Sequence, residues 1–182
     1  MKRALTVLAL LGIASLAASS RPAAARQADP SAPAVPDVFK DPESLVRGIY
    51  AAVSFDPGPA PDWEFVKTFF LPQAVIVVRK TRTSMAVMTV QEFVDWFADD
   101  VEKFKMKERG FEETVEKIKL TRLGDIAQAF VVYKARLKTP ADTPGQVGLD
   151  SWTLLRKDGR WWIASIANEI PTPDRPLPEE LR

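Results

Sequence analysis

The sequence predicts a single α+β domain in which helices come first and a mostly antiparallel sheet follows. Apolar residues recur at helical spacing between Asp41 and Phe104, and from Glu112 onward they alternate with polar residues at a period of two. Two short turn sequences, Gly124-Asp125 and Asp158-Gly159, separate long strand-like runs, as tight hairpin turns do. A chain of 182 residues is long enough for one such domain.

Three helices are expected before the sheet, with two short strands between the second and the third. The first helix begins at Asp41-Pro42, where an N-cap residue precedes a proline at the first helical position. The second is capped by Asp62, and the third follows a capping box at residues 89–92. The β-branched run at residues 74–78 and the short apolar run at 85–88 predict strands.

The alternating region predicts two long hairpins, and two-residue turns set their pairing. In the first hairpin, Glu116 should lie opposite Tyr133 on the face that packs against the helices. In the second, Trp152 should lie opposite Ser165, and both faces are largely apolar. Because the helices can cover only one face, the other must meet a partner subunit or the tail of the chain.

The two ends of the chain differ in composition from the domain between them. A basic start precedes an apolar run that is short for a membrane span, and Ala23-Ala24-Ala25 provides an A-x-A cleavage site. We expect residues 1–25 to be a signal peptide rather than a membrane anchor, and the protein to be exported to a bacterial periplasm or secreted. Residues 26–40 are predicted to be a disordered linker, 41–170 the domain, and 171–182 a proline-rich tail.

Composition excludes several classes of function. The chain contains no His and no Cys, which excludes imidazole acid–base catalysis, thiolate catalysis, disulfides and zinc–thiolate sites. No clustered Asp/Glu loop suggests a site for a hard cation, so we expect neither a metal nor a cofactor. A formal net charge of +1 provides no global field that would attract nucleic acid or an anionic membrane.

Three sequence segments carry a family resemblance. FLPQAVIVV follows the second helix, TVQEFVDWF forms the start of the third, and DGRWWIASI forms the last hairpin. With this order of elements, residues 41–170 resemble the nuclear transport factor 2-like (SnoaL-like) superfamily and, within it, an uncharacterised group of exported bacterial proteins. The resemblance implies a cone-shaped α+β domain, three N-terminal helices packed on a curved, mostly antiparallel sheet. It also implies a pocket at the open end of the cone and a homodimer formed through the outer sheet face.

The superfamily includes enzymes, and the residues that each type of active site needs can be compared with those present in this sequence. Dehydratase-type sites need histidines, which this chain lacks. An isomerase-type site needs a carboxylate base with a tyrosine, and the candidates are Glu116, Tyr133 and Tyr50. A hydrolase-type Asp-Arg-Asp site would have to use Asp150 with an arginine such as Arg136, which is predicted to lie on the outer face. The simpler alternative is that both tyrosines are core residues with satisfied hydroxyls.

Aromatic residues provide the candidates for a binding site. The ligand-binding candidates are Trp63, Trp96, Tyr50, Tyr133, Trp152 and Ser165. The leading hypothesis is an exported, non-catalytic binding or interaction domain whose cone holds a small apolar ligand. The alternatives are a lyase or isomerase of the polyketide-cyclase or ketosteroid-isomerase type, and a structural partner in cell-envelope assembly whose cone is filled by side chains.

Overall fold

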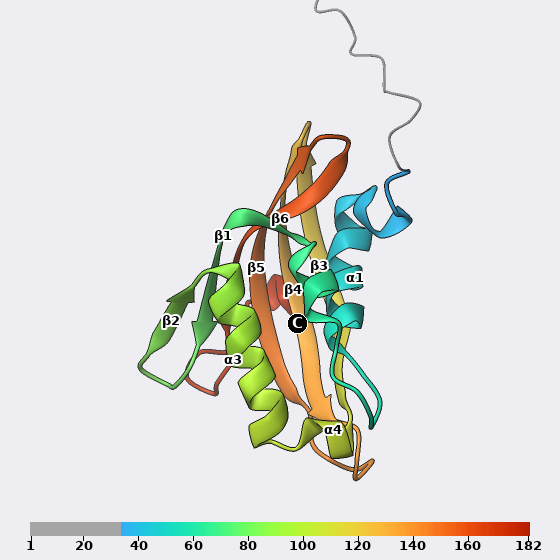
Figure 1. Ribbon diagram of the computed structural model, residues 1–182. Helices are drawn as coiled ribbons and strands as arrows, with labels where there is room; N and C mark the ends of the chain where they lie inside the picture. Colours follow the sequence, from blue (N-terminus) through green and yellow to red (C-terminus); the bar gives the residue numbers. More distant parts are fainter. Residues whose placement is uncertain (1–33) are drawn as a thin grey trace, which may run out of the picture. The chain divides into compact units, whose positions relative to one another are not determined.

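A curved six-stranded sheet wraps around the helices in residues 34–182, the part of the chain that the computed structural model describes (Figure 1). The strand order is β2-β1-β6-β5-β4-β3, and every neighbouring pair is antiparallel except β1 and β6. The helices are α1 (Pro42–Val53), α2 (Trp63–Lys67), α3 (Val90–Lys103) and α4 (Met106–Arg109), with short 3₁₀ turns η1 (Asp37–Phe39) and η2 (Glu179–Leu181). The strands are β1 (Phe70–Arg79), β2 (Met85–Met88), β3 (Phe111–Leu123), β4 (Ile126–Leu137), β5 (Gln146–Lys157) and β6 (Arg160–Glu169). The predicted α+β fold is confirmed.

The predicted helix starts are confirmed by their capping hydrogen bonds. The Asp41 carboxylate accepts from the backbone N–H groups of Glu43 and Ser44 at the start of α1. Thr89 and Glu92 form a complete capping box at the start of α3.

Helix α2 is shorter than the aromatic run up to Phe70 predicts. Strand β1 already begins at Phe70 and includes Pro72. The β1–β6 register is interrupted between Phe70 and Val75, so Pro72 lies where the ladder requires no backbone N–H donor.

The packed domain begins before the expected boundary at Asp41. Phe39, inside the predicted linker, is buried and stacks on Phe69 with 5.0 Å between ring centroids. The signal peptide predicted at residues 1–25, and the linker up to residue 33, lie outside the described residues, so export stays a prediction. Within residues 34–182, no helix is both long and apolar enough to cross a membrane.

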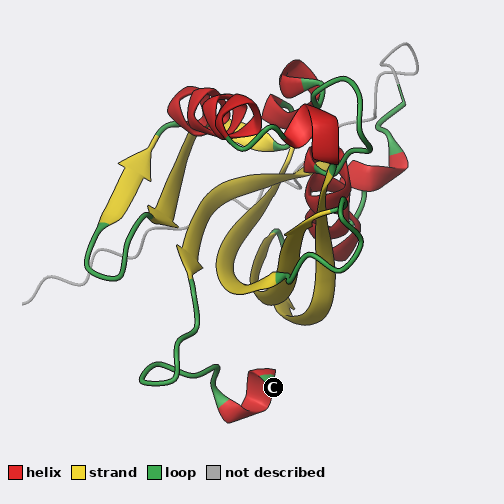
Figure 2. Ribbon diagram, turned by 90° about the horizontal axis from the view of Figure 1, so that it is seen from below, coloured by secondary structure: helices red, strands yellow, loops and turns green. Residues whose placement is uncertain are grey.

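The helices lie against the concave face of the sheet, and the C-terminal tail lies on the opposite side (Figure 2). The core between helices and sheet includes Leu45 of α1, Val101 of α3, and Val131 and Leu154 of the sheet, all almost fully buried. Burial of such aliphatic side chains contributes about 1.5–3 kcal/mol each to the free energy of unfolding. This core fixes the concave wall on which the candidate site is built.

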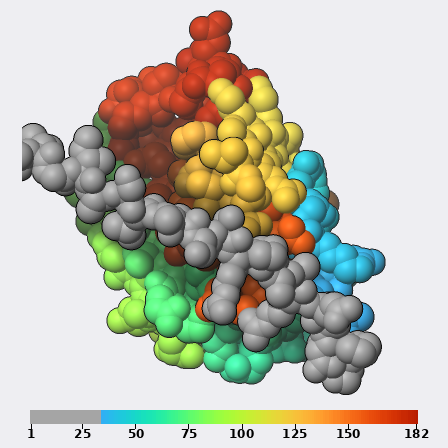
Figure 3. Space-filling view, turned by 90° about the horizontal axis from the view of Figure 1, so that it is seen from above, coloured from blue at the N-terminus to red at the C-terminus, as the bar shows by residue number. Residues whose placement is uncertain are grey.

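The tail covers part of the convex face. Leu181 is buried, and the Lys117 ammonium group of β3 donates a 2.8 Å hydrogen bond to the carbonyl oxygen of Arg182. In the space-filling view the red C-terminal segment lies beside the yellow strand β3 (Figure 3). Phe130 and Val75 remain exposed on this face. The homodimer expected through it stays a prediction.

A β-bulge in β3 overturns the predicted pairing of Glu116. Val115 lies opposite Tyr133 and Lys117 lies opposite Val132, so Glu116 is the extra residue of the bulge and is exposed. Because one extra residue reverses the alternation of side chains, Phe111 and Glu113, which precede the bulge, face the concave side.

A second irregularity, between β5 and β6, overturns the predicted pairing of Trp152. Leu154 still lies opposite Ile163, but Thr153 pairs with Ser165 and Trp152 pairs with Ile166. Ser165 therefore lies on the convex side of the sheet. The same shift brings Asn168, opposite Asp150, onto the concave side.

Candidate functional site

A cavity of about 280 Å³ lies between the concave face of the sheet and helix α3. This volume is near the lower end of the range of about 300–1,000 Å³ for small-molecule sites. Its wall comes from α1, α3, α4 and all strands of the sheet except the edge strand β2. The cone is therefore not filled by side chains, as it would be in a purely structural protein.

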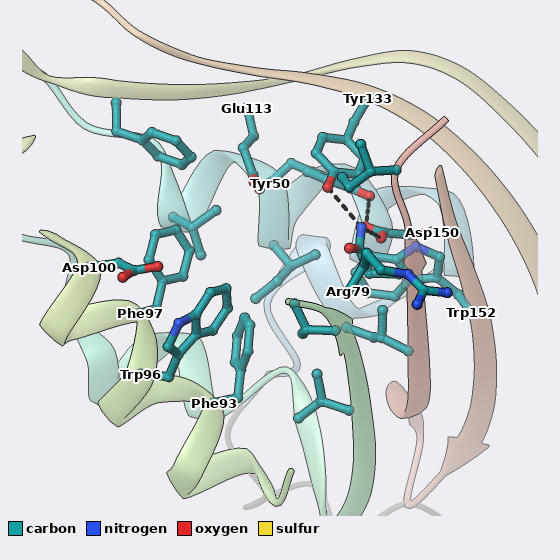
Figure 4. Close-up of a pocket in the computed structure, with 18 of the residues that line it drawn as sticks. Tyr50, Arg79, Phe93, Trp96, Phe97, Asp100, Glu113, Tyr133, Asp150 and Trp152 are labelled. Atoms are coloured by element: carbon teal, nitrogen blue, oxygen red, sulfur yellow. Dashed lines mark hydrogen bonds between the residues drawn. The ribbon is translucent and has the colours of Figure 1, made fainter. Parts of the chain in front are cut away.

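One end of the cavity holds a hydrogen-bonded cluster, which we call the polar end and which consists of Tyr50, Tyr133, Asp150 and Asn168 (Figure 4). The Tyr50 hydroxyl donates to Asp150 Oδ2 at 2.5 Å. The Asn168 side-chain amide donates to Asp150 Oδ1 at 2.8 Å and to the Tyr133 hydroxyl at 2.8 Å. Both oxygens of the buried Asp150 carboxylate are thus engaged. One residue comes from α1 and one from each of β4, β5 and β6, so only the folded sheet assembles the cluster.

Burial sets the protonation of this cluster. It raises the pKa of Asp150 to about 6, although the hydrogen bonds from Tyr50 and Asn168 act in the opposite direction by stabilising the ionised form. Burial, reinforced by the nearby Asp150 charge, raises the pKa of the Tyr50 and Tyr133 hydroxyls above their ordinary values. At neutral pH the polar end therefore contains one mostly ionised carboxylate held by neutral donors.

Glu113 of β3 is the second carboxyl group that points into the cavity (Figure 4). Its backbone is fixed by Ser54, whose hydroxyl accepts from the Glu113 N–H at 2.9 Å. Its side-chain oxygens have no hydrogen-bond partner among residues 34–182. Desolvation, followed by repulsion from Asp150, raises the pKa of Glu113 to about 8. Glu113 is thus mostly protonated at neutral pH and free to bond to a ligand.

The opposite wall is aromatic and comes from helix α3. We call Phe93, Trp96 and Phe97 the aromatic end (Figure 4). Their rings pack on one another with centroids 6.0–6.1 Å apart, and Phe97 also meets Phe111 edge to face. Trp96 is only half-buried, so its ring is accessible from the cavity.

Four of the six predicted ligand-contact residues line the cavity. Tyr50 packs against both Tyr133 and Trp152, with ring centroids 5.5 Å and 5.7 Å apart, and Trp96 lies on the aromatic end. Their predicted binding role stays a prediction, since their position alone does not test it.

Three other candidates are placed elsewhere. Trp63 does not line the cavity but packs against the Phe97 ring, 5.4 Å away between centroids. Ser165 is turned to the convex side, and the bulge exposes Glu116 to solvent. The proposed isomerase site built on Glu116 and Tyr133 therefore does not exist in this structure.

Sequence reasoning missed the polar residues that matter most for the chemistry of the cavity. Asp150 was considered only for a hydrolase-type site, and Asn168 and Glu113 are not among the predicted site residues. The signal for Asp150 was present, because it shares the period-two face of Trp152 and Leu154. Glu113 and Asn168 depend on the two bulges, which no turn sequence indicates.

Residues 34–182 contain no group of three or more Asp and Glu side chains placed to hold a metal ion. The lining is apolar apart from a few polar groups, which suits an organic molecule better than a bare cation.

Comparison with solved structures shows the fold. An NTF2-like protein with a cystatin-like fold from Novosphingobium aromaticivorans superposes with a TM-score of 0.55 at 14% identity, over 73% of this chain and 85% of that one. An NTF2-like protein of unknown function from Pseudomonas putida gives a TM-score of 0.56 at 10% identity, over 77% and 92%. A cystatin-like protein of unknown function from Nostoc punctiforme gives 0.55 at 14%, over 75% and 92%.

At these identities the likeness concerns the fold alone. No protein-family model matches the chain, and no curated protein matches it in sequence. The protein has the NTF2-like, cystatin-like fold that its sequence predicts.

Proposed function

We propose that the protein binds a small, mainly apolar molecule with one polar group in the cavity between α3 and the sheet. The observation that carries this proposal is the separation of chemistry within one cavity: aromatic rings on one side and, on the other, a polar cluster beside the unpaired Glu113 carboxyl. An apolar body would be buried against α3, while its polar group would bond to Glu113.

Screening by thermal shift and calorimetry tests this proposal. The purified protein is screened against aromatic, terpenoid, fatty-acid and polyketide compounds, and hits are titrated with the wild type and two variants. Trp96→Ala should weaken binding by about tenfold or more, because loss of a buried aromatic contact costs on the order of 1–3 kcal/mol. The matched control is Trp162→Ala, a half-buried tryptophan on the convex side that does not line the cavity. Equal losses in both variants would contradict binding in this cavity.

A second candidate is an isomerase or lyase that moves a proton on the bound molecule. It is favoured by the two cavity carboxyls, since a mostly protonated Glu113 and a mostly ionised Asp150 form an acid–base pair at neutral pH. It is disfavoured by the engagement of both Asp150 oxygens, which leaves Glu113 as the free group for proton transfer. Deuterium uptake from D₂O into a bound ligand, abolished by Glu113→Gln while binding persists, would support it over simple binding.

We also propose that the protein functions outside the cytoplasm, on the basis of the predicted signal peptide at residues 1–25. Cell fractionation with mass determination of the mature N-terminus tests this. A full-length chain retained in the cytoplasm would contradict it.

A further inference from the structure

Two carboxyl groups of the cavity are left without a cationic partner when the ion pairs of its lining are assigned. Arg79 is the only basic residue in the lining, and Glu169 holds it through two hydrogen bonds of 3.0 Å and 2.5 Å. Asp100 lines the cavity near the Lys80 ammonium group. Asp150 and Glu113 remain, and neither has a cationic partner among residues 34–182.

Aromatic rings surround the space in front of these two carboxyl groups. Tyr50 and Tyr133 lie at the polar end with Trp152 packed against Tyr50, and Phe93, Trp96 and Phe97 lie at the aromatic end. The Lys80 ammonium nitrogen lies 3.4 Å from the centroid of the Trp96 ring, so this ring already takes part in one cation–π contact. Aromatic rings beside carboxylates are the usual protein environment for an organic ammonium group.

Beside the polar end, the protein leaves one hydrogen-bond donor unsatisfied. Trp152 is 2% exposed and lines the cavity, and its indole N–H has no hydrogen-bond partner among residues 34–182. A buried unsatisfied donor costs about 1–3 kcal/mol. The indole nitrogen itself is closed to the cavity space, so this N–H is not a contact offered to a ligand, and an ammonium group, which only donates hydrogen bonds, would not satisfy it.

We propose that the ligand of this cavity is a small organic ammonium ion, a protonated amine on an apolar or aromatic body, whose charge lies between Glu113 and Asp150. This inference rests on the proposed binding function and names the chemical class of the ligand. The amine N–H groups bond to Glu113, the ammonium charge compensates Asp150, and the apolar body packs against Trp96 and Phe93. Carboxylate ligands are excluded from the site by like charge.

Binding of a cation is linked to proton release. Burial holds Glu113 mostly protonated at neutral pH, and a cation beside it favours the ionised form. The titratable and charged groups around Glu113 are Tyr50 of α1, Arg79 of β1, Asp100 of α3, Tyr133 of β4 and Asp150 of β5. Of these, Arg79 is paired with Glu169 and both tyrosines are neutral, so Asp150 is the charge that most affects Glu113.

Three probes of similar shape and different charge test the proposal: phenethylamine, phenethyl alcohol and phenylacetate. Titration calorimetry of the full chain at pH 7 should show the amine binding about tenfold tighter than the alcohol, since a charge-assisted hydrogen bond is roughly twice as strong as a neutral one. Phenylacetate should show no binding. Repeating the amine titration in buffers of different ionisation enthalpy should reveal release of about one proton per amine bound.

The matched variants are Glu113→Gln and Glu116→Gln. Glu113→Gln should abolish the proton release and lower the affinity for the amine, leaving only the preference over the alcohol that the Asp150 charge supplies, while binding of the alcohol shows that the variant is folded. Glu116→Gln removes the exposed glutamate three positions away and should change neither.

The outcomes separate the ammonium inference from the proposed binding function. Equal affinity for amine and alcohol would overturn the ammonium inference and leave the proposed binding function standing. Tighter binding of phenylacetate would overturn the inference as well. Failure of both amine and alcohol to bind would overturn the inference and count against the cavity as a binding site.

Discussion

The two ends of the cavity differ in how completely the protein satisfies their side chains. At the polar end, Asp150 accepts hydrogen bonds from Tyr50 and Asn168, so this carboxylate is tied into the fold. At the aromatic end, Trp96 is half-buried and open to the cavity. We expect residues at the polar end to determine stability more than binding and those at the aromatic end to do the reverse. Glu113, which is half-buried in the cavity wall and has an unpaired carboxyl group, belongs to both.

The largest expected loss of stability comes from removing the acceptor of the polar end. Asp150→Ala leaves the Tyr50 hydroxyl and an Asn168 N–H without an acceptor, and each buried unsatisfied group costs about 1–3 kcal/mol. The free energy of unfolding from urea denaturation should fall by about 3 kcal/mol. Asp100→Ala, which removes a cavity aspartate that is not part of this cluster, should cost much less. Equal losses would contradict a stabilising role for the polar end.

The next effect is a dependence of stability on pH. The pKa of Glu113 is raised in the folded state, to about 8 from its ordinary value of 4.5, so the folded protein holds a proton that the unfolded chain releases between these values. The free energy of unfolding should therefore fall as pH rises from 5 to 8, by about 2–4 kcal/mol at about 1.4 kcal/mol per pKa unit. Asp150, with its pKa raised to about 6, contributes the same sign below pH 6.

Glu113→Gln isolates the glutamate's part of this pH dependence. The variant carries no charge to bury, so its urea midpoint should exceed that of the wild type at pH 8 and match it at pH 5. A wild-type protein whose stability is flat or rises across this range would show that Glu113 is ionised and well solvated.

A smaller effect distinguishes the two tyrosines of the polar end. Tyr50 donates a hydrogen bond to the Asp150 carboxylate, whereas the Tyr133 hydroxyl accepts from Asn168. Tyr50→Phe should cost about 2 kcal/mol, because bonds to charged groups contribute about 1.5–3 kcal/mol, and Tyr133→Phe about 1 kcal/mol. Urea denaturation of both variants measures the difference. The reverse order would show that Asp150 is not the acceptor that organises the cluster.

The smallest effect on stability should come from the aromatic end. Trp96→Ala should lower the free energy of unfolding by only about 1 kcal/mol, since its ring is partly exposed and its contact with Lys80 is worth about 0.5–1 kcal/mol. A loss comparable to that of Asp150→Ala would show that Trp96 belongs to the core, and the contrast between the two ends would fail.

The sequence predicted the frame of the cavity better than its chemistry. Helix caps at Asp41 and Thr89 and the turn at Asp158-Gly159 are local features, and each formed where it was expected. Asp158 and Gly159 have φ of 52° and 79°, the left-handed conformations that a two-residue hairpin turn requires. Such signals depend on a few neighbouring residues, so they can be found without the fold.

The chemistry depended on two shifts of strand register that have no local signal. The bulge at Glu116 turns Glu113 into the cavity, and the shift between Ile163 and Ser165 turns Asn168 toward Asp150. A bulge is stabilised by how the whole sheet curves around the helices, so counting residues back from the turn passes over it. The two wrong pairings, those of Glu116 and Trp152, both lie beside the cavity, and bulges commonly redirect side chains next to functional sites.

The most direct test of the account is the titration of the Glu113 carboxyl carbon by NMR, with Glu113→Gln used to assign the signal. The account predicts a midpoint near pH 8 in the free protein and a lower midpoint when phenethylamine is added. A midpoint near the ordinary glutamate value of 4.5 that the amine does not change would contradict it, because Glu113 would then be an ordinary solvated glutamate.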